Sequence, residues 1–112
     1  MNKDKGTKHF IHQNITSIAL IPLVFWLCFS MAFLPETDYQ HLIEWIKFPA
    51  NTLLLIITIG LAFYHAQLGL QMIIEDYIST PSTQLLSISV IKLSCLLLSL
   101  IGFYAVLKIS LA

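Results

Sequence analysis

Long apolar runs separated by short polar segments dominate the chain, and three of these runs are long enough to cross a membrane. They cover about residues 15–34, 49–76 and 85–111. A helix needs about 20 apolar residues to span a hydrocarbon core of about 30 Å. The pattern therefore predicts an all-α membrane protein with three transmembrane helices. Pro22 should kink the first helix, and Pro35 should end it.

The polar segment between the first two spans, residues 36–47, carries a helical pattern of its own. Thr37 and Gln40 have the spacing of a capping box. The apolar side chains that follow recur at helical spacing: Tyr39, Leu42, Ile43 and Ile46. Trp45 suits the headgroup level of a bilayer. We therefore predict a short helix lying in the membrane surface between the first and second transmembrane helices.

The other polar segments lie outside the predicted spans. Residues 1–13 form a polar lead, which we expect to lie along the membrane interface or against a soluble partner. His9 and His12 in this lead are expected to be solvated. Residues 79–83 read Ser-Thr-Pro-Ser-Thr, a composition typical of a turn between the second and third spans.

Composition supports the membrane class. Hydrophobic residues make up 57% of the chain and charged residues 11%, whereas soluble domains are usually about 45–50% apolar and about 25% charged. The formal net charge is zero and no basic patch exists, so nucleic-acid binding is not indicated. Cys28 and Cys95 both lie in apolar segments, so neither a zinc site nor a disulfide framework is indicated. We expect residues 1–112 to form a single domain in contact with lipid.

The distribution of lysines predicts the orientation of the chain. Three lysines precede the first span, one accompanies three acids in the first connector, and none lies in the second connector. Under the positive-inside rule the N-terminus lies on the cytoplasmic or matrix side and the C-terminus on the opposite side. No cleavable targeting segment is visible, which favours a bacterial inner membrane or an organelle-encoded protein of the mitochondrial inner membrane.

Several polar or small residues inside the spans have a structural interpretation. Thr16 and Ser17 can donate hydrogen bonds back to carbonyls of their own helix. Gly102 allows neighbouring helices to approach closely, whereas Gly60 has two alternatives: the same close approach, or a glycine that a membrane helix tolerates without a packing role. Lys92, inside the third span, has two alternatives: its side chain snorkels to the nearer surface, or it contacts an acidic cofactor group such as a haem propionate.

His65 is the one histidine inside a predicted span, and an ionisable side chain at that depth is costly enough to indicate function. Gly69, Met72 and Asp76 share its helix face. The missing side chain at Gly69 would let a flat group or another helix approach the backbone. Two alternatives follow for His65: a neutral imidazole hydrogen-bonded to a neighbouring helix, or an axial ligand of a haem iron.

The second span ends in a polar group formed by Glu75, Asp76 and Tyr77. One interpretation is an interfacial helix end with a tyrosine at headgroup level. The other is a quinone site, in which a phenol donates a hydrogen bond and a carboxylate takes part in proton delivery. Asn14 or Ser17 from the first span could line the same region.

Residues 65–77 read His-Ala-x-x-Gly-(x)5-Glu-Asp-Tyr. This pattern resembles the second transmembrane helix of succinate dehydrogenase hydrophobic membrane anchor subunits, the small cytochrome b subunits of complex II. Residues 8–18 are similar to the segment that leads into the first helix of that family. Asn14 stands where the family usually has Arg, which puts any contact made by that arginine in doubt.

The resemblance implies cofactors and partners. His65 would be an axial ligand of a b-type haem, Tyr77 would contact a ubiquinone oxygen, and Asp76 would lie beside that quinone. No other histidine of the chain is expected to reach the depth of His65, so a second cytochrome b anchor subunit would supply the other haem ligand. A flavoprotein and an iron–sulfur subunit would oxidise succinate, because this chain has neither a flavin fingerprint nor a cysteine set for an iron–sulfur cluster.

Two other functions are compatible with the same pattern. A fumarate reductase anchor, or another quinone-linked cytochrome b anchor, would use the same cofactors with electron flow in the opposite direction. A structural or assembly membrane protein would bind no cofactor, and its His65 would only cross-link helices. A b-type haem spectrum separates the second of these functions from the others.

Overall fold

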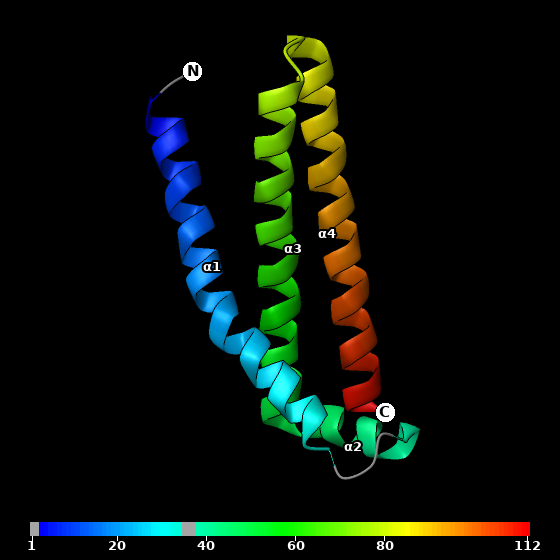
Figure 1. Cartoon of the computed structure of the whole chain (residues 1–112). Coiled ribbons are helices and arrows are strands. Elements are labelled where there is room, and N and C mark those ends of the chain that lie inside the picture. The colour runs from blue at the N-terminus through cyan, green and yellow to red at the C-terminus, as the bar shows by residue number, and fades with distance from the viewer. Residues whose placement is uncertain (1–2, 35–37) are drawn as a thin grey trace.

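The computed structural model describes residues 3–34 and 38–112. Within these ranges the chain forms four helices: α1 (Lys3–Ala32), α2 (Tyr39–Lys47), α3 (Pro49–Tyr77) and α4 (Pro81–Leu111) (Figure 1). The same ranges contain no strand. The predicted all-α fold, with a short helix between the first and second long helices, is confirmed.

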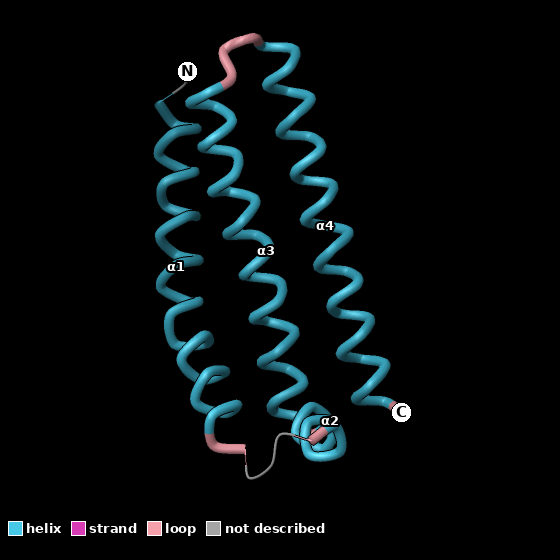
Figure 2. The backbone as a smooth tube through the Cα atoms, turned by 45° about the vertical axis from the view of Figure 1, so that its right-hand side comes forward, coloured by secondary structure: helices cyan, strands magenta, loops and turns pink. Residues whose placement is uncertain are grey.

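The three long helices run antiparallel to their neighbours, and α3 lies between α1 and α4 (Figures 1 and 2). The short helix α2 lies across one end of the bundle, called the α2 end below, where it contacts both α3 and α4. The other end, called the turn end, holds the start of α1 and the α3–α4 turn. The molecule is 51 Å long. Because a hydrocarbon core is about 30 Å thick, part of the bundle extends beyond it.

Each long helix is sufficiently long and apolar to cross a membrane: Gly6–Ala32, Pro49–Tyr77 and Pro81–Leu111. Few of their side chains are buried within the chain. In the described part, the buried apolar residues are Leu68, Ile74 and Val106. The chain therefore has almost no apolar core, and its large exposed apolar surface is suited to contact with lipid or other subunits.

Two glycines allow α3 and α4 to approach closely. A Cβ atom at Gly60 would lie 3.2 Å from Phe103 Cζ, and one at Gly102 would lie 3.0 Å from Ile59 Cγ2. The two contacts are reciprocal, because each helix supplies one glycine and one large side chain. The close approach predicted at Gly102 is confirmed, and of the two alternatives for Gly60 the close approach is observed.

Replacing Gly102 by leucine is expected to destabilise the α3–α4 contact by about 1–3 kcal/mol, because the new side chain must displace Ile59. Thermal unfolding of the purified protein in detergent measures the effect as a lower midpoint. Ala105→Leu, at an exposed position of the same helix, is the matched control and should leave the midpoint unchanged. Equal midpoints for Gly102→Leu and the native chain would contradict the packing.

The first helix is longer than the apolar pattern predicts. It begins at Lys3, so most of the polar lead continues the helix instead of lying along the interface. His9 and His12, predicted to be solvated, contact α3. His9 Nε2 lies 3.1 Å from the carbonyl oxygen of Leu68, and His12 Nδ1 lies 3.2 Å from Tyr64 Oη. These tertiary contacts stabilise helical turns that hydropathy does not detect.

Prolines shape both ends of the bundle. Pro22 lies inside α1, which bends along its course as predicted (Figure 1). The predicted stop at Pro35 falls outside the described residues, and α1 ends at Ala32. Pro81 is the first residue of α4, so the turn predicted over residues 79–83 is shorter and the third span begins earlier. A proline suits the first helical position because the amide hydrogen missing there would have had no partner.

The surface helix α2 is capped by Asp38. The carboxylate accepts hydrogen bonds from the backbone N–H of His41, at 2.9 Å, and from its ring Nδ1, at 2.6 Å. These bonds, the backbone one above all, hold the pKa of Asp38 below its ordinary value. The cap predicted at Thr37 falls outside the described residues. The Trp45 ring stacks on Trp26 of α1, with 5.5 Å between centroids, which ties α2 to the bundle.

Candidate functional site

His65 faces α1, where its ring Nδ1 lies 2.9 Å from the hydroxyl oxygen of Thr16. Thr16 is buried, with 4% of its surface exposed. The same hydroxyl oxygen lies 2.9 Å from the carbonyl oxygen of His12 and 3.0 Å from that of Gln13, in the preceding turn of α1. The back-bonding predicted for Thr16 is confirmed, and the hydroxyl also holds the imidazole of His65.

These contacts assign the proton of the His65 ring. A carbonyl oxygen only accepts, and two of them lie within reach of the Thr16 hydroxyl, which favours donation of its single proton within α1. In the tautomer that carries its proton on Nδ1, the ring donates to this hydroxyl oxygen and Nε2 keeps its lone pair. Nε2 has no hydrogen-bond partner in the part of the chain that the structure describes. Metal-ligating histidines are typically held in this way, with the other ring nitrogen donating to a protein acceptor.

An apolar groove of about 430 Å³ adjoins His65. Its wall is formed by residues of α1: Ser17, Leu20, Ile21, Val24, Phe25 and Cys28. The described residues contain no group of three or more His, Cys, Asp or Glu side chains that could hold a bare metal ion. One imidazole beside an apolar wall instead fits an iron that a flat macrocycle already holds on its other sides.

Gly69, one turn from His65, also faces α1. A Cβ atom there would lie 3.7 Å from Gln13 Nε2. Of the two predicted neighbours of Gly69, a flat group or another helix, the second is therefore observed. Gln13 Oε1 is buried and has no hydrogen-bond partner among the described residues. Such an acceptor is expected to receive a hydrogen bond from water, a bound group or another subunit.

The prediction that no other histidine approaches the depth of His65 needs correction for His12. His12 lies one helical turn from Thr16, and its ring contacts the hydroxyl of Tyr64, the residue next to His65. The prediction placed His12 in a solvated lead. His12 is exposed, but the helical extension of α1 also brings its ring alongside α3.

Asp76 and Glu75 line a second groove, of about 490 Å³, between α1 and α3 toward the turn end. The other residues of its lining are Gly6, His9, Phe10, Gln13, Asn14 and Met72. Asn14 thus lies in the region of Asp76, as predicted, whereas Ser17 lies in the His65 groove. Tyr77 is outside this lining, and 84% of its surface is exposed at the end of α3. Its phenol is accessible to a group outside this chain.

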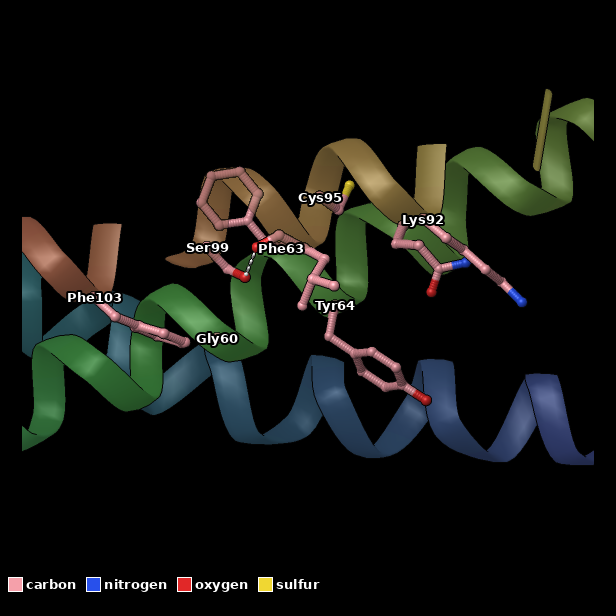
Figure 3. A pocket seen from close by; sticks show the side chains of 9 residues that line it. Gly60, Phe63, Tyr64, Lys92, Cys95, Ser99 and Phe103 are labelled. Atoms are coloured by element: carbon pink, nitrogen blue, oxygen red, sulfur yellow. Dashed lines mark hydrogen bonds between the residues drawn. The ribbon is translucent and has the colours of Figure 1, made fainter. Parts of the chain in front are cut away.

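Lys92 lies on the opposite side of α3 from the wall of the His65 groove. It lines a groove between α3 and α4, together with Tyr64 and Gln67 (Figure 3). The structure does not bring Lys92 together with His65. The predicted contact with a haem propionate therefore gains no support from the fold of this chain.

Residues 1–104 match the family described as succinate dehydrogenase/fumarate reductase transmembrane subunit. The chain belongs to this family. The succinate dehydrogenase hydrophobic membrane anchor subunit of Rickettsia prowazekii is 34% identical over 93 residues, which cover 82% of this chain and 74% of the relative. The subunit of the same name from Rickettsia bellii is 35% identical over 92 residues, with 82% and 74% covered.

A further relative of this transmembrane subunit has a lower identity. The succinate dehydrogenase membrane anchor subunit of Reclinomonas americana is 27% identical over 90 residues, which cover 78% of this chain and 75% of the relative. No solved structure matches the chain significantly. The family resemblance predicted from residues 65–77 and 8–18 is confirmed.

The transmembrane subunit divides its predicted site residues between two sides of α3. His65 and Asp76 line grooves between α1 and α3, whereas Lys92, on α4, lines the groove between α3 and α4. The inter-helix role of Thr16 and the buried acceptor of Gln13 were not predicted. The sequence shows only that Gln13 and Thr16 are polar residues near the start of an apolar run. This position does not specify which groups they contact.

Proposed function

We propose that this transmembrane subunit anchors a succinate dehydrogenase in a respiratory membrane and that His65 ligates a b-type haem through Nε2. The observation that carries the proposal is the 2.9 Å contact between His65 Nδ1 and the Thr16 hydroxyl, because it leaves the Nε2 lone pair available. The groove beside His65 adds an apolar wall. The haem, when bound, would supply a centre that accepts and releases one electron.

Each residue of this site has a physical role. His65 would coordinate the iron, and Thr16 would orient the imidazole and increase its basicity by accepting the Nδ1 proton. The apolar side chains of α1 would exclude water from the ligated face. The second axial ligand would come from a second cytochrome b anchor subunit, because none of His9, His12 and His41 lines the groove beside His65.

The turn end of the bundle supports a ubiquinone site shared with other subunits. The exposed phenol of Tyr77 would donate a hydrogen bond to a quinone oxygen, which becomes more basic as the quinone is reduced. Asp76, on the adjacent position of α3, would take part in proton delivery from the groove that also contains His9. The quinone would bind against the outer surface of this chain, and the electron donor would belong to another subunit.

The orientation follows from the lysines near the start of α1 together with the fold. The turn end, with Asp76 and Tyr77, would lie on the cytoplasmic or matrix side, and the α2 end on the opposite side. An iron–sulfur subunit and a flavoprotein subunit would bind at the turn end and deliver electrons to the quinone. The membrane would be the bacterial inner membrane or the mitochondrial inner membrane.

Purification of the intact complex through a tag on this chain tests the proposal. We expect a flavoprotein and an iron–sulfur subunit to co-purify, and a reduced-minus-oxidised spectrum to contain the α band of a b-type haem. Recovery of the chain without these subunits and without haem would favour the structural or assembly alternative. Assays of succinate oxidation and fumarate reduction in the same particle distinguish the dehydrogenase from a fumarate reductase.

Replacing Thr16 by valine is expected to weaken haem binding about 10- to 100-fold and to shift the midpoint potential, because the isosteric side chain cannot accept the Nδ1 proton of His65. Haem retention during purification and a redox titration measure the two effects. Thr58→Val is the matched control, since the buried Thr58 hydroxyl donates to the Leu54 carbonyl of its own helix and Thr58 does not line the His65 groove. An unchanged potential and unchanged retention in Thr16→Val would show that Thr16 does not position a ligand.

A further inference from the structure

The contacts of α2 locate the membrane boundary at one end of the bundle. Asn51 and Thr52 of α3 both donate side-chain hydrogen bonds to carbonyls of α2. Thr52 also lies 3.1 Å from the hydroxyl of Ser110, so α3 and α4 share this level. If α2 lies in the membrane surface, about 20 residues of helix, or about 30 Å, separate this level from the opposite boundary. That count ends near Met72 on α3 and Val90 on α4.

Lys92 therefore lies about half a turn inside the boundary at the turn end. Its side chain is exposed and extends toward the turn end of α4 (Figure 3). Among the described residues it has no hydrogen-bond or ion-pair partner. An ammonium group at this depth is costly unless it reaches the headgroup layer or meets an anion.

Glu75, the carboxylate of α3 closest to the depth of Lys92 in the membrane, already accepts a hydrogen bond within α3. Glu75 Oε1 accepts a hydrogen bond from Gln71 Nε2 at 3.1 Å, and Gln71 Oε1 accepts one from Gln67 Nε2 at 2.8 Å. Glu75 also lines the groove on the α1 side of α3. The charge of Lys92 is thus left uncompensated on the α4 side.

The groove beside Lys92 is amphipathic along the membrane normal. Its volume is about 310 Å³. Lys92 forms its polar end, toward the turn, whereas Gly60 and Phe103 form its apolar end, deeper in the bundle (Figure 3). A phospholipid of the leaflet at the turn end has the same order, with its phosphate near the boundary and its acyl chains deeper.

We propose that this α3–α4 groove binds an anionic phospholipid of the leaflet at the turn end. The phosphate would pair with Lys92 Nζ, and an acyl chain would lie along the groove toward Gly60. The uncompensated positive charge favours an anionic lipid, because a zwitterionic lipid brings a cation of its own beside Lys92. The inference does not depend on the haem or the quinone, because the α3–α4 groove includes neither Tyr77 nor any residue that lines the His65 groove.

Quantitative mass spectrometry of lipids retained by the purified complex tests the proposal. Lys92→Gln should lower the amount of anionic phospholipid retained per complex about fivefold, because one lysine near the membrane surface raises the affinity for anionic lipid by about that factor. Lys92→Arg should retain the native amount. Lys108→Gln is the matched control, because Lys108 lies on the same helix at the α2 end, near the ring of Tyr104.

Unchanged retention in Lys92→Gln, or an equal loss in the Lys92→Gln and Lys108→Gln complexes, would overturn the proposal. A crosslink from position 92 to a partner subunit would also overturn it, by showing that protein covers the groove. Reconstitution gives a second measurement that does not depend on purification losses. In nanodiscs of phosphatidylcholine, added phosphatidylglycerol should raise the thermal midpoint of the native complex but not that of Lys92→Gln, whereas inorganic phosphate should raise neither.

Discussion

Replacing His65 by alanine is expected to remove the proposed b-type haem from the complex. The affinity of the variant complex for haem should be more than about 100-fold lower than that of the native complex. Loss of a ligand has a larger effect than loss of the hydrogen bond that orients it, which alone lowers affinity about 10- to 100-fold. The Thr16 hydroxyl would also lose its partner across the α1–α3 contact. The measurement is the reduced-minus-oxidised spectrum of the purified complex, normalised to the flavin content.

A matched control separates this effect from a general loss of structure. His41→Ala removes an imidazole at the α2 end, where the ring Nδ1 bonds to the Asp38 carboxylate. It should leave the haem spectrum unchanged. If His65→Ala retained a native spectrum in an assembled complex, His65 would be only a hydrogen-bonded link between α1 and α3, which was the first alternative for this residue.

The number and order of the helices were predictable because they follow from hydropathy and length. The start of α1 was not predictable in this way. Lys3, Lys5 and Lys8 make the lead polar, and a polar segment before a span is usually assigned to solvent. The helix nevertheless continues to Lys3, since the rings of His9 and His12 bond to α3. Only the packed structure contains this information.

The candidate site was predictable to the same extent. The depth of His65 and its position on the helix follow from the sequence, because both belong to one helix. Its contact with Thr16 depends on how α1 and α3 are aligned against each other, and nothing in either helix specifies that alignment. The side of α3 on which Lys92 lies depends likewise on the rotation of α4. The sequence therefore predicts which helix each residue belongs to, but not which residues of two helices contact each other.

The two faces of α3 explain why it is the central helix. Toward α1 it presents polar partners, including His65 and Tyr64, which bond to side chains across the contact. Toward α4 it presents Ile59 and Gly60, which interlock with Gly102 and Phe103. Close packing of small residues holds α3 and α4 together in an apolar medium. The α1 contact can thus contribute a hydrogen-bonded histidine without being the main source of helix association.

Replacing Tyr77 by phenylalanine is expected to lower succinate–quinone reductase activity about 10- to 100-fold, because the lost hydrogen bond leaves a charged or basic quinone oxygen without its donor. The ring and its packing are kept. Electron transfer from succinate to a soluble artificial acceptor should stay at the native level, since that acceptor does not need the quinone site. The two assays on one preparation give the ratio that checks the prediction.

The control for this substitution is Tyr104→Phe, which removes a phenol hydroxyl from a tyrosine that is 66% exposed on α4. Tyr104 lies near Lys108, toward the α2 end, away from the end at which the electron donors are proposed to bind. Its loss should change neither activity. An equal decrease of both activities in Tyr77→Phe would place Tyr77 in subunit assembly instead. Because 84% of Tyr77 is exposed in the isolated chain, its phenol is accessible to quinone, to another subunit or to the headgroup layer. A loss of quinone reduction alone indicates the quinone, an equal loss of both activities indicates a subunit contact, and no loss indicates the headgroup layer.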